Sequence, residues 1–302
     1  MDKKNFGYLV ATLRKEARNE FDETLTQYDL AELARMPLIT LQKIEQGRQA
    51  NIKPDMLLNL AEALHLGSRA RQFFFLASLG IRDNQSVRSV ASPQAVLDEL
   101  TQTLSQLQCP AFILDGFGDI VAMNPSSLTA FNLELSELHA PHLLSQYNLN
   151  RFLFSPEFDN LYTVLMEDVR SPAVRRTVML YKLWTLKYRN HWYFQRLLPE
   201  LNRYQIFREY WQSPAWHDED IYVEYNHITL KHPELGLIKF LACPTHAITT
   251  QGDLNLFVLQ PLDPQTAEIC LQLTKILGTQ AIPLARWPKP PTPTGLLKID
   301  KG

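Results

Sequence analysis

Cysteine is scarce in this chain of 302 residues, which has only Cys109, Cys243 and Cys270. These three residues are far apart and odd in number, and no second cysteine lies near any of them. The sequence therefore supports neither a disulfide framework nor a zinc site. Glycine is also scarce, at 11 residues, and no glycine-rich phosphate-binding pattern is present, so we expect no nucleotide cofactor.

Catalytic patterns are lacking as well. His139 and His142 have a spacing that ligands on a helix can have, but Pro141 lies between them and no carboxylate cluster is near. The sequence contains no nucleophile turn of the hydrolase type and no glycine-rich oxyanion loop. We therefore expect neither a metal site nor an enzyme.

Long hydrophobic runs are absent too. No apolar stretch approaches the ~20 residues that a membrane span needs, and residues 1–5 lack the apolar core of a signal peptide. The composition, 45% apolar and 21% charged, is that of an ordinary globular protein long enough for two domains. We expect a cytoplasmic protein with no membrane association.

An excess of positive charge is lacking overall, because the net charge is -2, but the charge is unevenly distributed. Residues 1–90 contain 13 Lys and Arg against 11 Asp and Glu, whereas residues 91–302 contain 17 against 21. Within residues 35–53 there are four basic residues and one acidic residue. This local excess is what a single DNA-binding module needs.

The stretch from residue 25 to residue 48 has apolar positions at helical spacing in two short blocks, separated by a break at residues 35–37. These positions are Leu30, Leu33, Ala34, Leu41 and Ile44. The break is too short for a linker, so the two helices must meet at a steep angle. This arrangement is a helix-turn-helix, whose second helix can lie in a DNA major groove.

Three further helices surround this hairpin in the predicted N-terminal domain, residues 1–81. The expected helices are residues 6–19, a second helix that follows the N-cap Thr26 and ends at the break, a third helix from Pro37 to Gly47, and two more at residues 55–64 and 69–79. Thr26 and Asp29 have the spacing of a capping box, Pro37 suits the first turn of a helix, and Gly47 ends the third helix. The result is an all-α domain of five short helices.

The first turn of the third helix supplies the candidates for base recognition. Gln42 can form two hydrogen bonds with adenine, and Lys43 can donate to guanine. Leu38 and Ile39 can only pack against thymine methyl groups, so hydrogen-bonded recognition at this end of the helix is expected to be weak. The alternative for Leu38 and Ile39 is a place in the core or in an interface.

Two cations, Arg48 and Lys53, follow the third helix and can bind phosphate, which adds affinity without sequence information. Glu45 is more simply the partner of a structural ion pair, because an acid facing phosphate is repelled.

The N-terminal region contains the motifs Leu25-Thr26-Gln27, Leu30-Ala31, Leu33-Ala34, Ile44-Glu45-Gln46-Gly47-Arg48 and Leu60-Ala61-Glu62-Ala63-Leu64. In these motifs it resembles the lambda-repressor-like, XRE-type DNA-binding domains. The resemblance implies that Gln27 contacts a phosphate and braces the third helix. The loop after the first helix is longer than in the simplest members, so Arg14 or, alternatively, Arg18 is expected to pair with Glu45.

A polar linker, residues 82–92, is expected to precede a second domain, residues 93–287. This domain is predicted to be α+β, with a five-stranded antiparallel sheet carrying inserted helices on one face. The expected strands are residues 111–115, 119–124, 222–231, 237–242 and 254–260, with helices at 93–107, within 125–211 and at 266–277. The proline-rich tail, residues 288–302, is expected to be extended or disordered.

The second domain contains, in this order, the motifs Pro110-Ala111-Phe112-Ile113-Leu114-Asp115, Val121-Ala122-Met123-Asn124, Asn148-Leu149-Asn150-Arg151-Phe152-Leu153-Phe154, Phe207-Arg208-Glu209-Tyr210-Trp211 and His232-Pro233-Glu234-Leu235-Gly236. In these motifs it is similar to the MmyB-like ligand-binding domains. The resemblance implies a PAS-like domain that follows an XRE-type module and holds a fatty acid or a similar apolar molecule. The segment after Arg170 is more aromatic than this family leads us to expect, so the ligand's identity does not follow from the resemblance.

An aromatic stripe offers a candidate ligand pocket. Its residues, at the spacing of one continuous helical face, are Tyr181, Trp184, Tyr188 and Trp192, followed by Arg196. An apolar trough ending in a guanidinium suits an acyl chain with a carboxylate head, with Phe240 and Leu256 on the opposing wall. The rival partners for the head group are Arg151, Arg189 and His217. The alternative is that the stripe is simply a helix face packed on the sheet.

These patterns predict a ligand-responsive transcriptional regulator that binds operator DNA. Because one helix-turn-helix binds modestly and two bind much more tightly, we expect a homodimer on an inverted repeat. No cofactor is expected apart from the apolar ligand. The alternative is a DNA-binding regulator whose second domain only mediates dimerisation or contact with another protein. Whether the protein represses or activates is open.

Overall fold

The computed structural model describes residues 2–19, 21, 23–49, 51–80, 92–158, 172–213 and 227–290. The chain forms two compact units. Unit 1 comprises Met1–Arg88, Pro172–Asn190 and Gln205–Tyr222, and unit 2 comprises Ser89–Ser171, His191–Tyr204 and Val223–Gly302. Apart from Ser92, the predicted linker lies outside the described residues.

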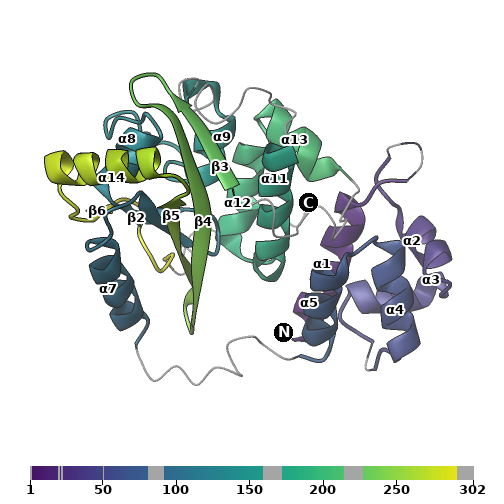
Figure 1. The fold of residues 1–302 in the computed structure, drawn as a ribbon. Coiled ribbons are helices and arrows are strands. Elements are labelled where there is room, and N and C mark those ends of the chain that lie inside the picture. The colour runs from purple at the N-terminus through teal and green to yellow at the C-terminus, as the bar shows by residue number, and fades with distance from the viewer. Residues whose placement is uncertain are drawn as a thin grey trace. The chain divides into compact units, whose positions relative to one another are not determined.

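Unit 1 is helical in its described part, and its N-terminal portion contains the five helices that the sequence predicts (Figure 1). They are α1 (Lys3–Glu16), α2 (Gln27–Leu33), α3 (Leu38–Glu45), α4 (Pro54–Ala63) and α5 (Ser68–Ser78). Three later elements belong to the same unit: α11 (Pro172–Trp184), the 3-10 turn η2 (Leu186–Tyr188) and α13 (Gln205–Gln212).

Local chemistry accounts for the ends of the hairpin helices. Thr26 and Asp29 form the predicted capping box, because each side chain binds the other residue's backbone N–H at the start of α2. After α3, Gly47 has a φ of 67°, in the region that favours glycine. Gly7 lets α1 approach α3 closely, because a Cβ at this position would lie 2.3 Å from the carbonyl oxygen of Ile44 on α3.

The core of unit 1 is built from the inward faces of these helices, with Phe6 and Phe74 packed at a ring-centroid distance of 5.0 Å. Of the apolar positions at helical spacing in the hairpin, Leu30, Leu41 and Ile44 are buried. Leu33, at the end of α2, is 54% exposed and does not belong to this core.

The later helices extend this core. Leu186 of η2 belongs to the same buried cluster as the helices α1 to α5. On α11, Tyr181 packs against Phe207 and Trp211 of α13, and these two rings are stacked 5.6 Å apart. The structure therefore differs from the predicted boundary, which placed all of residues 93–287 in the second domain.

Unit 2 contains an antiparallel sheet. In the described residues it has six strands, in the order β3-β4-β5-β1-β2-β6. The strands are β1 (Ala111–Asp115), β2 (Ile120–Met123), β3 (His227–His232), β4 (Gly236–Thr249), β5 (Gly252–Pro261) and β6 (Ile282–Pro283). The α+β prediction is confirmed, but the sheet has one more strand than expected, because β6 has only two residues and leaves no alternating pattern in the sequence.

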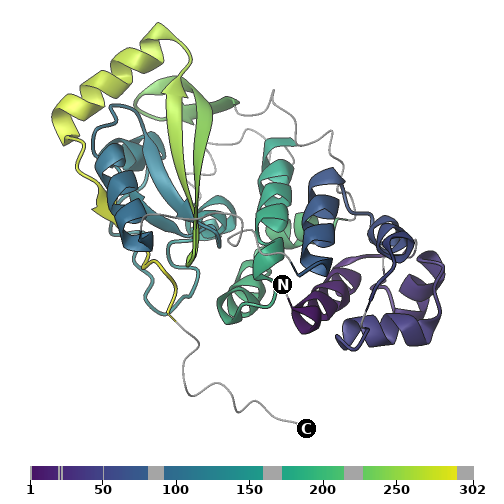
Figure 2. The same ribbon diagram turned by 90° about the horizontal axis from the view of Figure 1, so that it is seen from below.

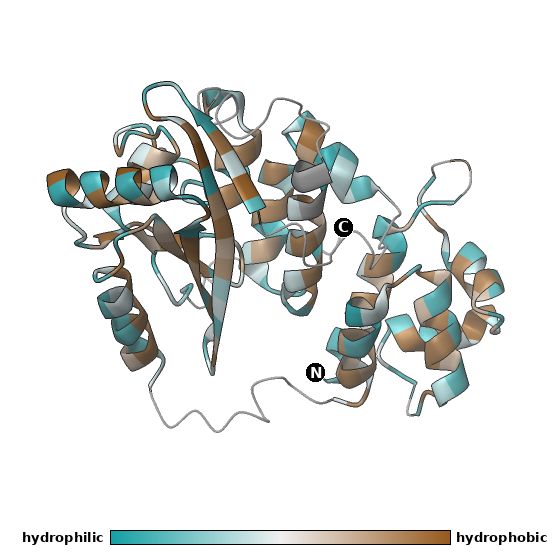
Figure 3. Cartoon of the chain, in the orientation of Figure 1, coloured by the Kyte–Doolittle hydropathy of each residue, from teal (hydrophilic) through white to brown (hydrophobic). Residues whose placement is uncertain are grey.

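Helices lie along both faces of the sheet, which corrects the prediction of helices on one face. Alternate residues of β1 point in opposite directions, so Phe112 and Ile113 belong to different buried clusters. One cluster includes Cys270 from α14 (Pro264–Leu277), and the other includes Leu104 from α7 (Pro93–Leu104). The long pair β4 and β5 is clear in Figure 2, and in Figure 3 these strands are largely brown while α14 carries both colours.

The remaining helical elements of unit 2 connect β2 to the strands β3 to β5. They are α8 (Pro125–Ala130), α9 (Leu149–Phe154), the 3-10 turn η1 (Pro156–Phe158) and α12 (Trp192–Leu201). Helix α12 is held at both ends, because the hydroxyl of Tyr193 donates to Asp119 and the carboxylate of Glu200 accepts from the backbone N–H of Ser145 at 3.0 Å. None of the helices in the described residues has the length and apolarity that crossing a membrane requires.

The first residues of the predicted tail are fixed rather than disordered. The ammonium of Lys289 lies 2.9 Å from the carboxylate of Asp115 and 2.5 Å from that of Asp119. Burial raises the pKa of Asp115 to about 6, although Lys289 opposes the rise. Burial alone would lower the pKa of Lys289, but the two carboxylates raise it. The sequence signal was misleading here because a proline-rich segment can still be anchored by one buried ion pair. Residues 291–302 lie outside the described residues.

Candidate nucleic-acid interface

Glu45, at the end of α3, is the centre of a hydrogen-bond network that fixes this helix. Its carboxylate accepts from Nε of Arg14 at 2.7 Å and from Nε2 of Gln27 at 2.6 Å. Arg14 also donates to the carbonyl oxygen of Leu25 at 2.8 Å. The pairing left open by the sequence is therefore made by Arg14, whereas Arg18 donates to the hydroxyl of Thr24. The predicted bracing of α3 by Gln27 is confirmed, and its contact with phosphate stays a prediction.

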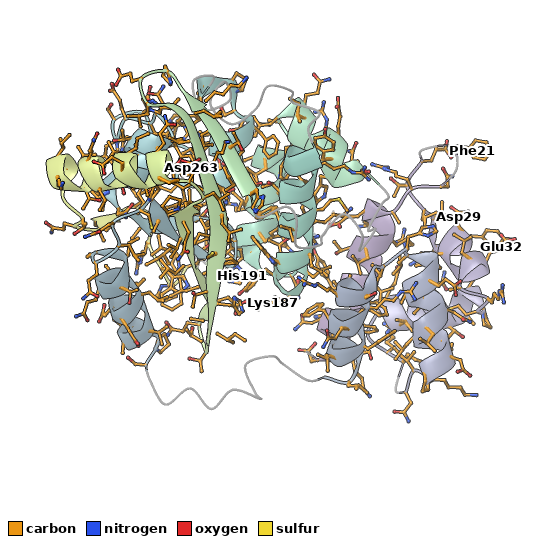
Figure 4. The ribbon with its side chains drawn as sticks, viewed as in Figure 1. Phe21, Asp29, Glu32, Lys187, His191 and Asp263 are labelled. Atoms are coloured by element: carbon orange, nitrogen blue, oxygen red, sulfur yellow. The ribbon has the colours of Figure 1, made fainter. Side chains whose placement is uncertain are left out.

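Replacing Glu45 by alanine is expected to lower the free energy of unfolding of unit 1 by about 2–3 kcal/mol. The change leaves Arg14 and Gln27 without their acceptor, and only 11% of the Arg14 side chain is exposed. Urea denaturation measures the loss, and Glu32→Ala on the exposed face of α2 serves as the control (Figure 4). An equally small effect of both variants would contradict the structural role of Glu45.

The outer face of α3 carries the predicted recognition residues. Leu38 is 37% exposed and Ile39 is 59% exposed, so the alternative that they belong to the core is wrong. Lys43 is exposed and Gln42 is half-buried. All four side chains are therefore accessible on one helix whose opposite face is buried in the unit.

Arg48 and Lys53 are exposed beyond the end of α3. Neither forms an ion pair with a carboxylate in the part of the chain that the structure describes. Both charges are therefore available to phosphate, as predicted from their position.

The loop between α1 and α2 is ordered around Asn19. Its side-chain oxygen accepts from the backbone N–H groups of Phe21 at 3.0 Å and Glu23 at 2.8 Å. Phe21, at the tip of this loop in Figure 4, is 74% exposed. The sequence indicated a loop here but not this internal support.

The predicted ligand stripe is not one continuous helical face. Tyr181 and Trp184 lie on α11, Tyr188 lies in η2 and Trp192 begins α12. The chain is not one α-helix between residues 184 and 192. Residues spaced three and four apart across this segment therefore do not lie on one helical face. Tyr181 is buried within unit 1, and Arg196 is exposed on α12 in unit 2.

Phe240 and Leu256 do not form one wall. Phe240 on β4 is opposite Pro261, while Leu256 on β5 is opposite Thr245. Phe240 and Thr245 are an odd number of positions apart on the same strand, so Phe240 and Leu256 point to opposite faces of the sheet. They accordingly belong to different buried clusters. The sequence could not show this because it does not give the register between the strands.

Comparison with protein families finds a match in the N-terminal region of the chain and another in the region that follows it. A helix-turn-helix family model matches residues 15–69. The model of the MmyB-like transcription regulator ligand binding domain matches residues 96–273, more than half of the chain. The chain belongs to the MmyB-like transcription regulators. A comparison with curated proteins finds no match.

As an MmyB-like regulator, the protein combines a DNA-binding helix-turn-helix with a ligand-binding domain, and it is a ligand-responsive transcription regulator. Its matched ligand-binding region includes α11, η2 and α13, which pack in unit 1 with the DNA-binding helices. The two family regions therefore do not coincide with the two compact units.

Two of the proposed head-group partners in this MmyB-like regulator bind carboxylates of the chain itself. Nη2 of Arg151 lies 2.7 Å from Glu157, and Nε of Arg189 lies 3.3 Å from Glu16. His217 lies outside the described residues. Arg196 is the predicted head-group partner for which the structure gives no such ion pair among the described residues.

Sequence reasoning missed the polar anchor between α1 and α11, formed by Glu16, Lys182 and Arg189. Only 1% of the Arg189 side chain is exposed, and its guanidinium lies 4.5 Å from the ring centroid of Trp211. Lys182 donates to the carbonyl oxygen of Trp211 at 2.9 Å, and burial lowers its pKa to about 8. Two basic residues within an aromatic run were the available signal, but a sequence alone does not distinguish them from solvated side chains.

Proposed function

We propose that this regulator binds operator DNA as a homodimer and that its ligand-binding domain holds an apolar small molecule such as a fatty acid. The single observation that supports DNA recognition best is the face of α3, where Leu38, Ile39, Gln42 and Lys43 are accessible while Leu41 is buried. In a helix-turn-helix this face enters the major groove.

The chemistry of this face supports the proposal of a dimer. Two of its four residues are apolar and contribute only contacts with thymine methyl groups, so one copy discriminates weakly among DNA sequences. Two copies on an inverted repeat, one helical turn apart, multiply affinity and specificity.

The ligand proposal rests on the family match and on the apolar residues of the matched region. Ligand control can reach the DNA through the helices that the family region contributes to unit 1. Helix α12 belongs to unit 2, and the chain continues from its two ends into η2 and α13 of unit 1. A ligand that favours one arrangement of α12 can shift DNA binding only as far as its affinity differs between the arrangements.

The test begins with the purified full-length protein. Organic-solvent extraction followed by mass spectrometry is expected to recover a lipid, and added palmitate or oleate is expected to raise the melting temperature of extracted and refolded protein. Absence of any lipid together with no melting shift would contradict the ligand proposal. It would favour a second domain that serves only dimerisation or protein contact.

A further inference from the structure

The first turn of α1 lies directly against the end of the recognition helix α3. A Cβ at Gly47 would be 2.7 Å from the Cα atom of Lys4 and 3.0 Å from the carbonyl oxygen of Lys3. Real Cβ atoms are not found so close to backbone, so the contact requires glycine. Lys3 and Lys4 are therefore next to the residue that precedes Arg48.

This turn carries positive charge where helix electrostatics disfavours it. The N-terminal end of a helix favours acidic residues. Asp2 supplies one at the N-cap, but the first turn of α1 itself has two lysines and no acidic residue. Both lysines are exposed, and among the described residues neither forms an ion pair with a carboxylate. Such departures from local rules are expected where function requires them.

The turn is also held in place from both sides. The Asp2 carboxylate caps α1 by accepting from the backbone N–H of Asn5 at 2.8 Å, and the amide of Asn190 donates to the side chain of Asn5. Lys3 and Lys4 are therefore flexible side chains on a fixed backbone beside the end of α3.

We propose that Lys3 and Lys4 bind DNA phosphates beside the phosphate bound by Arg48, so that the DNA-binding surface extends from α3 onto α1. The inference rests on the proposed operator binding. Lysine binds phosphate as a point charge and adds affinity independent of sequence. The backbone of Lys3 and Lys4 is packed against Gly47, the residue that precedes Arg48, so both lysines start from the same end of α3 as Arg48.

The experiment compares the full-length protein with Lys3→Gln/Lys4→Gln. The matched control is Arg69→Gln/Lys275→Gln, which removes two exposed charges, one from α5 and one from α14. Fluorescence anisotropy measures the dissociation constants for a selected operator and for an unrelated duplex. The measurements cover about 50 to 200 mM KCl, which gives the slope of log K against log salt. Circular dichroism melting verifies that both variants stay folded.

The Lys3→Gln/Lys4→Gln variant is expected to bind both duplexes about tenfold more weakly and to lose roughly 2 from the slope of log K against log salt. The control is expected to keep both values of the unaltered protein. The inference is overturned if Lys3→Gln/Lys4→Gln keeps its affinity and slope, or if the control loses as much. If the unaltered protein binds neither duplex, the proposed function falls as well, so the two failures are distinguishable.

Discussion

Replacing Glu16 by leucine is expected to lower the free energy of unfolding of unit 1 by about 3–5 kcal/mol. The Glu16 carboxylate accepts from Arg189 at 3.3 Å, and only 11% of the Glu16 side chain and 1% of the Arg189 side chain are exposed. Burial disfavours the charged forms of Arg189 and Lys182, and the Glu16 carboxylate offsets that cost for both. The penalty is therefore the desolvation cost that Glu16 no longer offsets, in addition to the energy of the lost contact.

The double variant Glu16→Leu/Arg189→Met separates the desolvation cost of the remaining buried charge from the energy of the lost contact. Removing both partners leaves no unpaired charge from this pair, so most of the lost stability is expected to return. Urea denaturation followed by tryptophan fluorescence measures all three proteins, and Trp184 and Trp211 lie in unit 1. A loss below about 1 kcal/mol for Glu16→Leu would show that the anchor does not stabilise this unit.

The polar anchor of Glu16, Lys182 and Arg189 couples the ligand-binding family region to the DNA-binding helices within unit 1. Helix α11 belongs to the ligand-binding family region, yet its Lys182 and the following Arg189 are joined to α1 of the DNA-binding helices. Any arrangement of the ligand-binding region that moves α11 must therefore move α1 or break a buried ion pair. Breaking it costs enough free energy that joint movement is the favoured outcome.

Replacing Lys43 by alanine is expected to relax sequence preference by about 1–3 kcal/mol at one base pair of the operator. The Lys43 ammonium is exposed on the outer face of α3 and can donate to guanine. Replacing Arg48 by alanine is expected instead to weaken binding to all sequences alike and to reduce the salt slope by about 1. Anisotropy titrations on the operator, on its single-base variants and on an unrelated duplex distinguish the two patterns.

The control for this pair is Lys275→Ala, an exposed lysine of α14 in unit 2, which is expected to change neither specificity nor slope. If Lys43→Ala weakened all sequences equally, the assignment of Lys43 to base recognition would be wrong. If both variants unfolded unit 1 in circular dichroism melting, the assignment of this face would be wrong.

The helix-turn-helix was predictable because its signals are local. The capping box of Thr26 and Asp29 and the end of the third helix at Gly47 are set by neighbouring residues, and the structure contains both. Pro37 is the N-cap of α3 and not, as predicted, a residue of its first turn. The choice between Arg14 and Arg18 as the partner of Glu45 needed the structure. Both arginines lie near the end of the first helix, and the sequence does not show which of them faces Glu45.

The ligand region was less predictable because its contacts are distant in the sequence. Arg189 and Glu16 are 173 residues apart, and no spacing rule links them. The aromatic spacing from Tyr181 to Trp192 matched a helix that the structure interrupts at η2. Periodicity describes a helix only where the chain remains helical. The candidate wall of Phe240 and Leu256 failed for a different reason, because the sequence does not give the register between β4 and β5.

The most direct test of ligand-responsive operator binding compares one protein preparation in two states. Operator selected from random duplexes is titrated with protein that retains the ligand with which it was purified, and with protein from which this ligand has been extracted. We predict that the dissociation constant differs at least about fivefold between the two states, and that the unrelated duplex shows a much smaller difference. Equal dissociation constants for the operator in both states would contradict the account.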